Sequence, residues 1–200
     1  MFRLSQQLND ELAFNGKVYP LDLSFDNVLV IFDVLNDDSV DDLEKTYVCL
    51  NRLTGLSLEE LLKIFDPETA FKTFKSIFDS CIKIRNRAKG QKYDLLGNPL
   101  PEVETDEDDE EPLYSIEHDA EYIYAAFMQV YRIDLIEVQG QLHWKKFNAL
   151  LAGLPDNTKM SEIMRIRAWK PSKYDSEVER GRMRKLKKLF ALPTTDRKED

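Results

Sequence analysis

The feature that most constrains the fold is an aromatic-rich segment in the third quarter of the chain. Eight of the thirteen residues from Tyr122 to Asp134 are large apolar or aromatic. At helical spacing they form two rows, which are Ile123, Phe127 and Val130 on one side, and Tyr124, Met128 and Tyr131 on the other. An ordinary surface helix carries a single apolar stripe. We therefore expect this helix to be enclosed by neighbouring helices or to contact a partner.

The remainder of the chain is predicted to be a series of capped helices behind one short hairpin. Asn15-Gly16 between residues 12–14 and 17–19 predicts a two-residue turn joining two strands. Helices are predicted over residues 24–36, 39–54, 58–65, 67–88, 115–131, 141–152, 158–169 and 172–191. The fold class is therefore mainly α, a bundle-like protein with a short N-terminal β-hairpin.

Caps and inward-facing positions support the helices of the first half. Ser39 is predicted to cap one helix, with Gly55 at its end, and Ser57 starts a capping box. Asp66-Pro67 predicts the start of the next helix. The side chains expected to face inward are Leu43, Tyr47 and Leu50, and then Leu58, Leu61, Leu62 and Phe65.

Composition divides the chain into two helical parts. Residues 1–95 hold the hairpin and the first helices, and residues 115–192 hold the others, followed by a polar tail over 193–200. Residues 96–114 are rich in proline and acids, and the eight acids from Glu102 to Glu111 supply −8 of the net charge of −9. We interpret this stretch as a solvated linker. Calcium binding or mimicry of DNA is the alternative, but the order of oxygen ligands and the central glycine of a calcium loop are missing.

No motif indicates catalysis, a metal or a cofactor. Cys49 and Cys81 are far apart, and we interpret both as small buried hydrophobic residues. His118 and His143 lack the ligand spacing of a metal site. There is no phosphate-binding glycine motif, no apolar leader and no apolar run long enough to span a membrane. The sequence thus predicts a soluble, non-enzymatic protein of a reducing compartment, without cofactor.

Two groups of residues are candidates for contact with a partner. Trp144 and Phe147 share a helix face and are interpreted either as core or as part of an exposed groove. Together with Tyr124, Phe127, Met128 and Tyr131 they form the candidate partner-binding set.

The last predicted helix offers an electrostatic contact through its six cations, Arg180, Arg182, Arg184, Lys185, Lys187 and Lys188. Because this helix also carries Val178, Met183, Leu186, Leu189 and Phe190, we expect it to dock on the body with its cations facing water, the acidic loop or a partner. Binding to nucleic acid or to a membrane surface is the alternative.

The order of motifs in the second half is also informative. Glu121-x-Ile123-x-Ala125-Ala126-Phe127-x-x-x-Tyr131 is followed by Asp134-Leu135, by Leu142-His143-Trp144-x-x-Phe147 and by Ile163-x-x-Ile166-Arg167. This order resembles the bacteriophage gene-product-fifteen family, found in tailed phages of Gram-positive bacteria and in their prophages. The Gly16-Lys17-x-Tyr19 turn is similar to the start of that family.

The resemblance implies a helical protein of the tail module of long-tailed phages, acting in the host bacterial cytoplasm. It implies a tail assembly chaperone that binds the tape measure protein, with the tail tube protein as a second partner and self-association open. A structural neck or tail component of the virion and a nucleic-acid-binding regulator that uses the basic helix are the alternatives.

Overall fold

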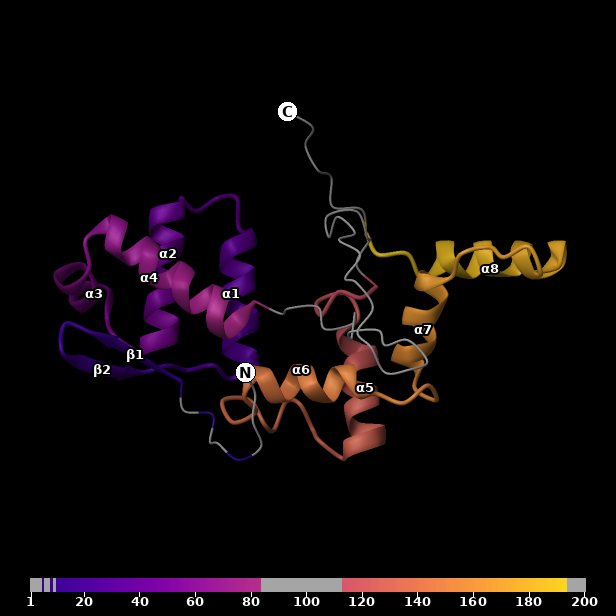
Figure 1. Ribbon diagram of the computed structural model, residues 1–200, viewed down its shortest axis with the longest axis horizontal. Coiled ribbons are helices and arrows are strands. Elements are labelled where there is room, and N and C mark those ends of the chain that lie inside the picture. Colours follow the sequence, from indigo (N-terminus) through magenta and orange to yellow (C-terminus); the bar gives the residue numbers. More distant parts are fainter. Residues whose placement is uncertain (1–4, 6–7, 9, 84–112, 194–200) are drawn as a thin grey trace, which may run out of the picture. The chain divides into compact units, whose positions relative to one another are not determined.

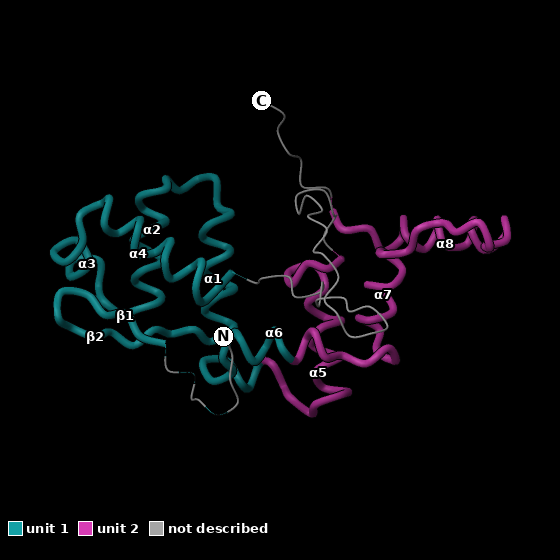
Figure 2. The backbone as a smooth tube through the Cα atoms, in the orientation of Figure 1, with its two compact units in different colours: residues 1–100, 136–149 teal, residues 101–135, 150–200 magenta. Residues whose placement is uncertain are grey.

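The computed structural model describes residues 5, 8, 10–83 and 113–193 of the chain. Helices dominate these residues, and one antiparallel hairpin lies at their N-terminal end, which confirms the predicted fold class (Figure 1). The chain divides into two compact units (Figure 2). Unit 1 contains residues 1–100 and 136–149, and unit 2 contains residues 101–135 and 150–200. The predicted acidic linker lies almost entirely outside the described residues, as does all of the polar tail after Pro193.

The hairpin forms where the Asn-Gly pair predicts it. Strands β1 (Glu11–Phe14) and β2 (Lys17–Pro20) pair antiparallel, with Phe14 opposite Lys17. Asn15 and Gly16 have φ angles of 48° and 73°. Both angles are positive, as a type I′ turn requires, and asparagine and glycine adopt them at the least cost.

Unit 1 is built mainly from consecutive helices with short connections. They are α1 (Phe25–Asn36), α2 (Asp42–Thr54), α3 (Leu58–Ile64), α4 (Pro67–Ile77) and the π-helical turn η1 (Phe78–Ile82). Helix α2 packs against α1, α3 and α4, so it is the centre of the unit. The predicted helix over 67–88 is helical as far as Ile82, but its α geometry ends at Ile77 and is followed by the π-helical turn; residues after Lys83 lie outside the described chain.

Most predicted caps are confirmed, and one is wrong. Ser57 forms a complete capping box, Asp66 accepts from the first turn of α4, and Gly55 ends α2 with a φ of 69°. The cap of α2 is Asp41 rather than Ser39. Ser39 instead donates its hydroxyl and its backbone N–H to the Asp37 carboxylate, at 2.6 and 2.9 Å. Ser39 therefore binds the neighbouring Asp37 carboxylate instead of capping α2 as the sequence pattern had predicted.

The core of unit 1 also corrects three predicted inward positions. Tyr47, Leu50, Leu61 and Phe65 are buried as expected. Leu43, Leu58 and Leu62 are instead 45%, 53% and 57% exposed. Each of these leucines lies on a helix whose inward face is already occupied by the buried residues. The apolar stripe of the helix is wider than that face, so these leucines lie at the surface.

Residues 136–149 join unit 1 through a backbone exchange with the segment before α1. The Trp144 N–H donates to the Leu23 carbonyl at 2.7 Å, and the Phe25 N–H donates to the Leu142 carbonyl at 2.9 Å. Ser24 and His143 form the bridge between these bonds. Helix α6 (Trp144–Ala152) therefore begins within unit 1, far in sequence from the other helices of that unit.

Unit 2 is built around α5 (Ala120–Tyr131) and α7 (Lys159–Ala168), which pack against each other. Helix α8 (Glu177–Leu189) follows α7 and contacts it. Thr158 caps α7, and Ser176 forms a capping box on α8. The predicted docking of α8 through a buried apolar face is wrong, because none of its residues is buried. The starts of α5 and α6 lie a few residues later than predicted.

Candidate functional site

The candidate contact residues of α5 divide between core and surface. Phe127 is fully buried, whereas the Met128 side chain is 36% exposed. Tyr124 and Tyr131 are half-buried, and their hydroxyls donate to the Asp134 carboxylate at 3.0 Å and to the Leu150 carbonyl at 2.9 Å. The second predicted row is therefore only partly buried, and the hydroxyls of its two tyrosines are hydrogen-bonded within unit 2.

The two candidates of α6 lie in the core of unit 1. Trp144 and Phe147 are each 1% exposed, and their rings stack with centroids 5.7 Å apart. Phe147 also stacks on Phe25 at 5.0 Å, and the Trp144 Nε1–H donates to the Ile82 carbonyl at 2.8 Å. Of the two interpretations left open by the sequence, the core one describes these side chains. The six candidates thus belong to different units, and partner contact through them stays a prediction.

A polar cluster that the sequence did not indicate surrounds His143. The Lys145 backbone N–H donates to its Nδ1 at 3.0 Å, so the proton sits on Nε2, which donates to the Asp10 carboxylate at 3.0 Å. Lys145 Nζ also binds Asp10, at 3.0 and 3.1 Å. Burial lowers the pKa of His143 below its ordinary value, and the nearby Asp10 offsets this only in part.

The geometry of this cluster connects two segments of the chain and is not that of a nucleophilic centre. The Cys81 Sγ lies 4.0 Å from Asp10 Oδ1. A histidine acts as the base for a cysteine only when one of its ring nitrogens is free and within reach of the thiol. Both ring nitrogens of His143 are engaged, by Lys145 and by Asp10. The arrangement therefore joins the segment before β1 to the start of α6.

A second polar centre that sequence reasoning missed lies in unit 2. The Arg167 guanidinium binds Asp119 through two bonds of 2.6 and 2.9 Å, with side-chain exposures of 9% and 2%. It also donates to the Leu113 carbonyl at 3.1 Å and to the Phe190 carbonyl at 2.6 Å. Burial opposes ionisation of Asp119, but the bonds from Arg167 and Ser115 outweigh it and lower the pKa of the carboxyl. One side chain thus joins three segments of unit 2.

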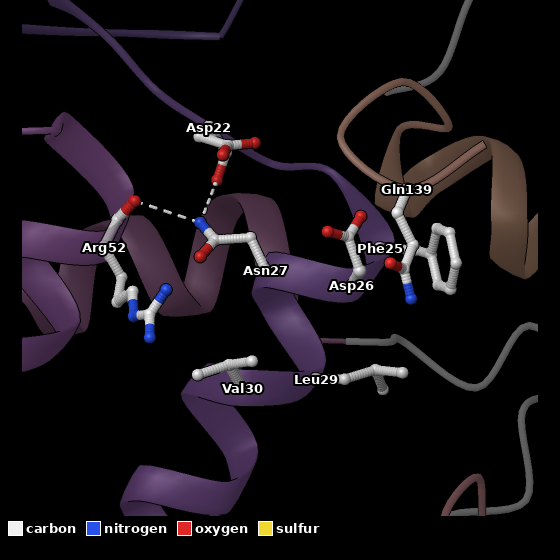
Figure 3. A pocket seen from close by; sticks show the side chains of 8 residues that line it. All are labelled: Asp22, Phe25, Asp26, Asn27, Leu29, Val30, Arg52 and Gln139. Atoms are coloured by element: carbon white, nitrogen blue, oxygen red, sulfur yellow. Dashed lines mark hydrogen bonds between the residues drawn. The ribbon is translucent and has the colours of Figure 1, made fainter. Parts of the chain in front are cut away.

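An open hollow of about 450 Å³ lies beside α1 (Figure 3). Its lining residues are Asp22, Phe25, Asp26, Asn27, Leu29, Val30, Arg52 and Gln139. The Asn27 amide donates to the Asp22 and Arg52 carbonyls, both at 3.0 Å (Figure 3). The Asp26 carboxylate accepts from the Gly140 N–H at 2.8 Å. These bonds hold α1 to its neighbours, so the polar lining serves the fold.

Unit 1 also exposes large apolar side chains on several elements. Leu58 and Leu62 lie one turn apart on α3, where Leu61 alone is buried. Phe71 on α4 is 52% exposed, and Val18 on β2 is 59% exposed. A monomer exposes single apolar residues routinely, whereas repeated exposure on neighbouring turns is typical of an interaction surface.

Neither a metal site nor a membrane span appears in the described part of the chain. Residues 10–83 and 113–193 contain no group of three or more histidine, cysteine or acidic side chains able to hold a metal. No helix described by the structure combines the length and apolar character needed to cross a bilayer.

Comparison with known proteins identifies the family. A family model described as Bacteriophage Gp15 protein matches residues 4–192. The chain belongs to the Gp15 family. This confirms the resemblance inferred from the motif order. No curated protein and no solved structure matches the chain.

The polar and aromatic centres described above lie within the part of the chain that matches the Gp15 family. The match covers the cluster around His143, the Trp144–Phe147 stack and the Arg167–Asp119 pair. The Gp15 family is not a known family of enzymes. In this Gp15 protein, several of the residues that carried the resemblance are buried, namely Phe127, Trp144, Phe147, Ile163 and Ile166.

Proposed function

We propose that this Gp15 protein is a non-enzymatic tail assembly chaperone that binds hydrophobic helices of the phage tape measure protein. A tape measure is a long, largely helical chain that would aggregate before the tail tube encloses it. A protein that covers its apolar helices keeps it dispersed until assembly. Tail tube subunits are a second partner under this proposal.

The observation that carries the proposal is the exposure of large apolar side chains on helices of a Gp15 chain. Leu58 and Leu62 project from α3 at the spacing of one helical turn, and Phe71 projects from α4. Met128 contributes a flexible apolar side chain on α5. An apolar helix is bound through anchors at such i, i+4 positions. These exposed residues are therefore the first contacts proposed.

The buried candidates would contribute only through a change in the core. Phe127, Trp144 and Phe147 are almost completely covered, so contact with a partner requires them to leave their packing. Tyr124 and Tyr131 are half-buried and belong to the same row of α5 as Met128. The proposal therefore places contact on the edge of α5 and on α3, with the buried rings as support.

Co-expression with a fragment of the tape measure protein tests the proposal. The fragment is expected to be insoluble alone and to co-purify with the full Gp15 chain. Leu58→Ser with Leu62→Ser, or Met128→Ser, should reduce the recovered fragment. The matched control is Glu59→Gln with Lys63→Gln, because this exposed pair lies on α3 and is joined at 2.6 Å without an apolar role.

Two results would count against the proposal. A fragment that stays insoluble with the wild-type chain contradicts chaperone activity. Detection of this chain by mass spectrometry in finished, purified phage particles favours a structural neck or tail component instead, because an assembly chaperone leaves before completion.

A further inference from the structure

Helix α8 differs from the other described helices because none of its residues is buried. Val178 and Leu189 are 82% and 73% exposed. They are three turns apart on one side of the helix, about 16 Å along its axis. Arg182 and Lys185 lie between them on that side, at the i+4 and i+7 positions. The outer face of α8, defined by these four residues, is thus apolar at its ends and cationic in its middle.

The cations of α8 have no acidic partners in the structure as described. No acidic residue occurs between Arg180 and Leu189, and no salt bridge within 113–193 involves the six cations of this stretch. Arg184 lies four residues from both Arg180 and Lys188, and like charges at that spacing destabilise a helix. An anionic partner would remove this repulsion.

Gly181 adds a second observation on the same helix. Glycine in a helix interior is destabilising relative to alanine. A Cβ built at Gly181 meets nothing within 4 Å, and its backbone needs no positive φ. Packing around α8 therefore gives no reason for glycine there. Its position next to Arg182 allows the backbone of a bound partner to approach the helix closely.

We propose that α8 is a docking helix for an acidic amphipathic helix of another protein. Acidic side chains of that helix would pair with Arg182 and Lys185, and apolar side chains about three turns apart would cover Val178 and Leu189. Nucleic acid fits less well, because phosphates neutralise the cations but leave both apolar ends in water. This surface is separate from the contacts proposed for the tape measure protein and does not depend on them.

A designed peptide tests the surface with the full-length chain. The probe is a fluorescent, alanine-rich helical peptide of about 20 residues, long enough to form a helix. It carries two leucines eleven residues apart and glutamates at the i+4 and i+7 positions between them. Binding is measured by fluorescence anisotropy. A second peptide, with both leucines changed to glutamine, keeps the charge and loses the apolar contacts.

Specific losses of affinity are expected from changes on the outer face. Val178→Ser with Leu189→Ser should weaken binding by about tenfold, as expected when two partly buried apolar contacts are removed. Arg182→Gln with Lys185→Gln should weaken binding by a similar factor and reduce its salt dependence. Gly181→Ala should weaken binding although it raises helical content measured by circular dichroism.

Matched controls come from unit 1. Val18→Ser with Leu43→Ser removes two other exposed apolar side chains, and Lys63→Gln with Lys72→Gln removes two other exposed cations. Both control variants should bind the peptide as the wild type does. Binding loss confined to the α8 variants supports the proposal, whereas equal loss in the controls overturns it.

Three further outcomes would overturn the proposal. Equal affinity for both peptides, together with tight binding of a single-stranded DNA oligonucleotide that survives Val178→Ser with Leu189→Ser, identifies a phosphate-binding face. Binding that occurs only after the eight acids of residues 102–111 are changed to amides identifies a segment of this chain as the occupant. Absence of binding in every form shows that the face has no such role.

Discussion

Replacing Arg167 with methionine is expected to destabilise unit 2 strongly. The change keeps an unbranched, flexible apolar stem but removes both charge-assisted bonds to Asp119, whose side chain is 2% exposed. Among the described residues, the donor that Asp119 then retains is the Ser115 N–H, at 3.0 Å. Breaking a buried ion pair on one side typically costs about 3–5 kcal/mol, because the remaining charge stays in a poorly solvated place. That is a large part of the stability of an ordinary domain.

The pH dependence should change sign in this variant. Asp119 has a lowered pKa in the folded chain, so the pair stabilises the fold above the unfolded value of about 3.9 and loses this contribution as pH falls through the folded pKa. Without Arg167, burial is left to raise the pKa of Asp119. The variant therefore gains stability as pH falls from 7 towards about 5, and its deficit relative to the wild type narrows.

Urea unfolding provides the assay. The chain has two tryptophans, and a Trp144→Phe background leaves Trp169, in unit 2, as the fluorescent reporter. Asp119→Asn combined with Arg167→Met should recover much of the loss, because the buried charge is gone. Arg165→Met on the exposed side of α7 is the control, expected within about 0.5 kcal/mol of the wild type. A loss below about 1 kcal/mol that does not vary with pH would refute the reasoning.

Three other predictions concern single side chains. Gly55→Ala should lower the free energy of unfolding by about 1 kcal/mol, because Gly55 has a φ of 69°. Gly181→Ala should raise it by up to about 1 kcal/mol. Thermal unfolding that shows a change of the same sign for both variants contradicts this prediction. Iodoacetamide should modify Cys81 before Cys49 in the folded chain, because Cys49 is buried and burial raises its pKa to about 11; peptide mass spectrometry that shows equal rates would disprove it. Trp144→Phe should cost about 1–3 kcal/mol, since the Ile82 carbonyl loses its donor, and a neutral effect in urea unfolding would show that water replaces the indole.

The predictions that succeeded depend on residues close together in the sequence. The Asn15-Gly16 turn, the Ser57 capping box and the Gly55 helix end each involve a few consecutive residues. Their geometry is decided by backbone angles and by bonds to the next turn. The two-row pattern of α5 is a different case, because Phe127 is buried whereas Met128 is 36% exposed. The helix is therefore not enclosed on both sides, and its contact with a partner stays a prediction.

The candidate site shows where this local reasoning ends. Trp144 and Phe147 share a helix face, as predicted, but periodicity does not say whether that face meets a core or a groove. Residues far away in sequence place this face in the core, because the Ile82 carbonyl accepts from the Trp144 indole and Phe25 stacks on Phe147. Likewise, α8 has the apolar spacing of a docked helix, yet none of its residues is buried.

The sequence by itself determined the mainly helical class, the N-terminal hairpin and the Gp15 family. Tertiary structure alone decided that residues 136–149 belong with unit 1, that Arg167 pairs with Asp119, and that Leu58 and Leu62 remain exposed. The physical reason is the distance along the sequence over which each kind of interaction acts. Caps and turns form their hydrogen bonds within a few residues, whereas burial and ion pairing depend on which distant segment packs against a residue. A linear pattern of apolar and charged residues does not specify that segment.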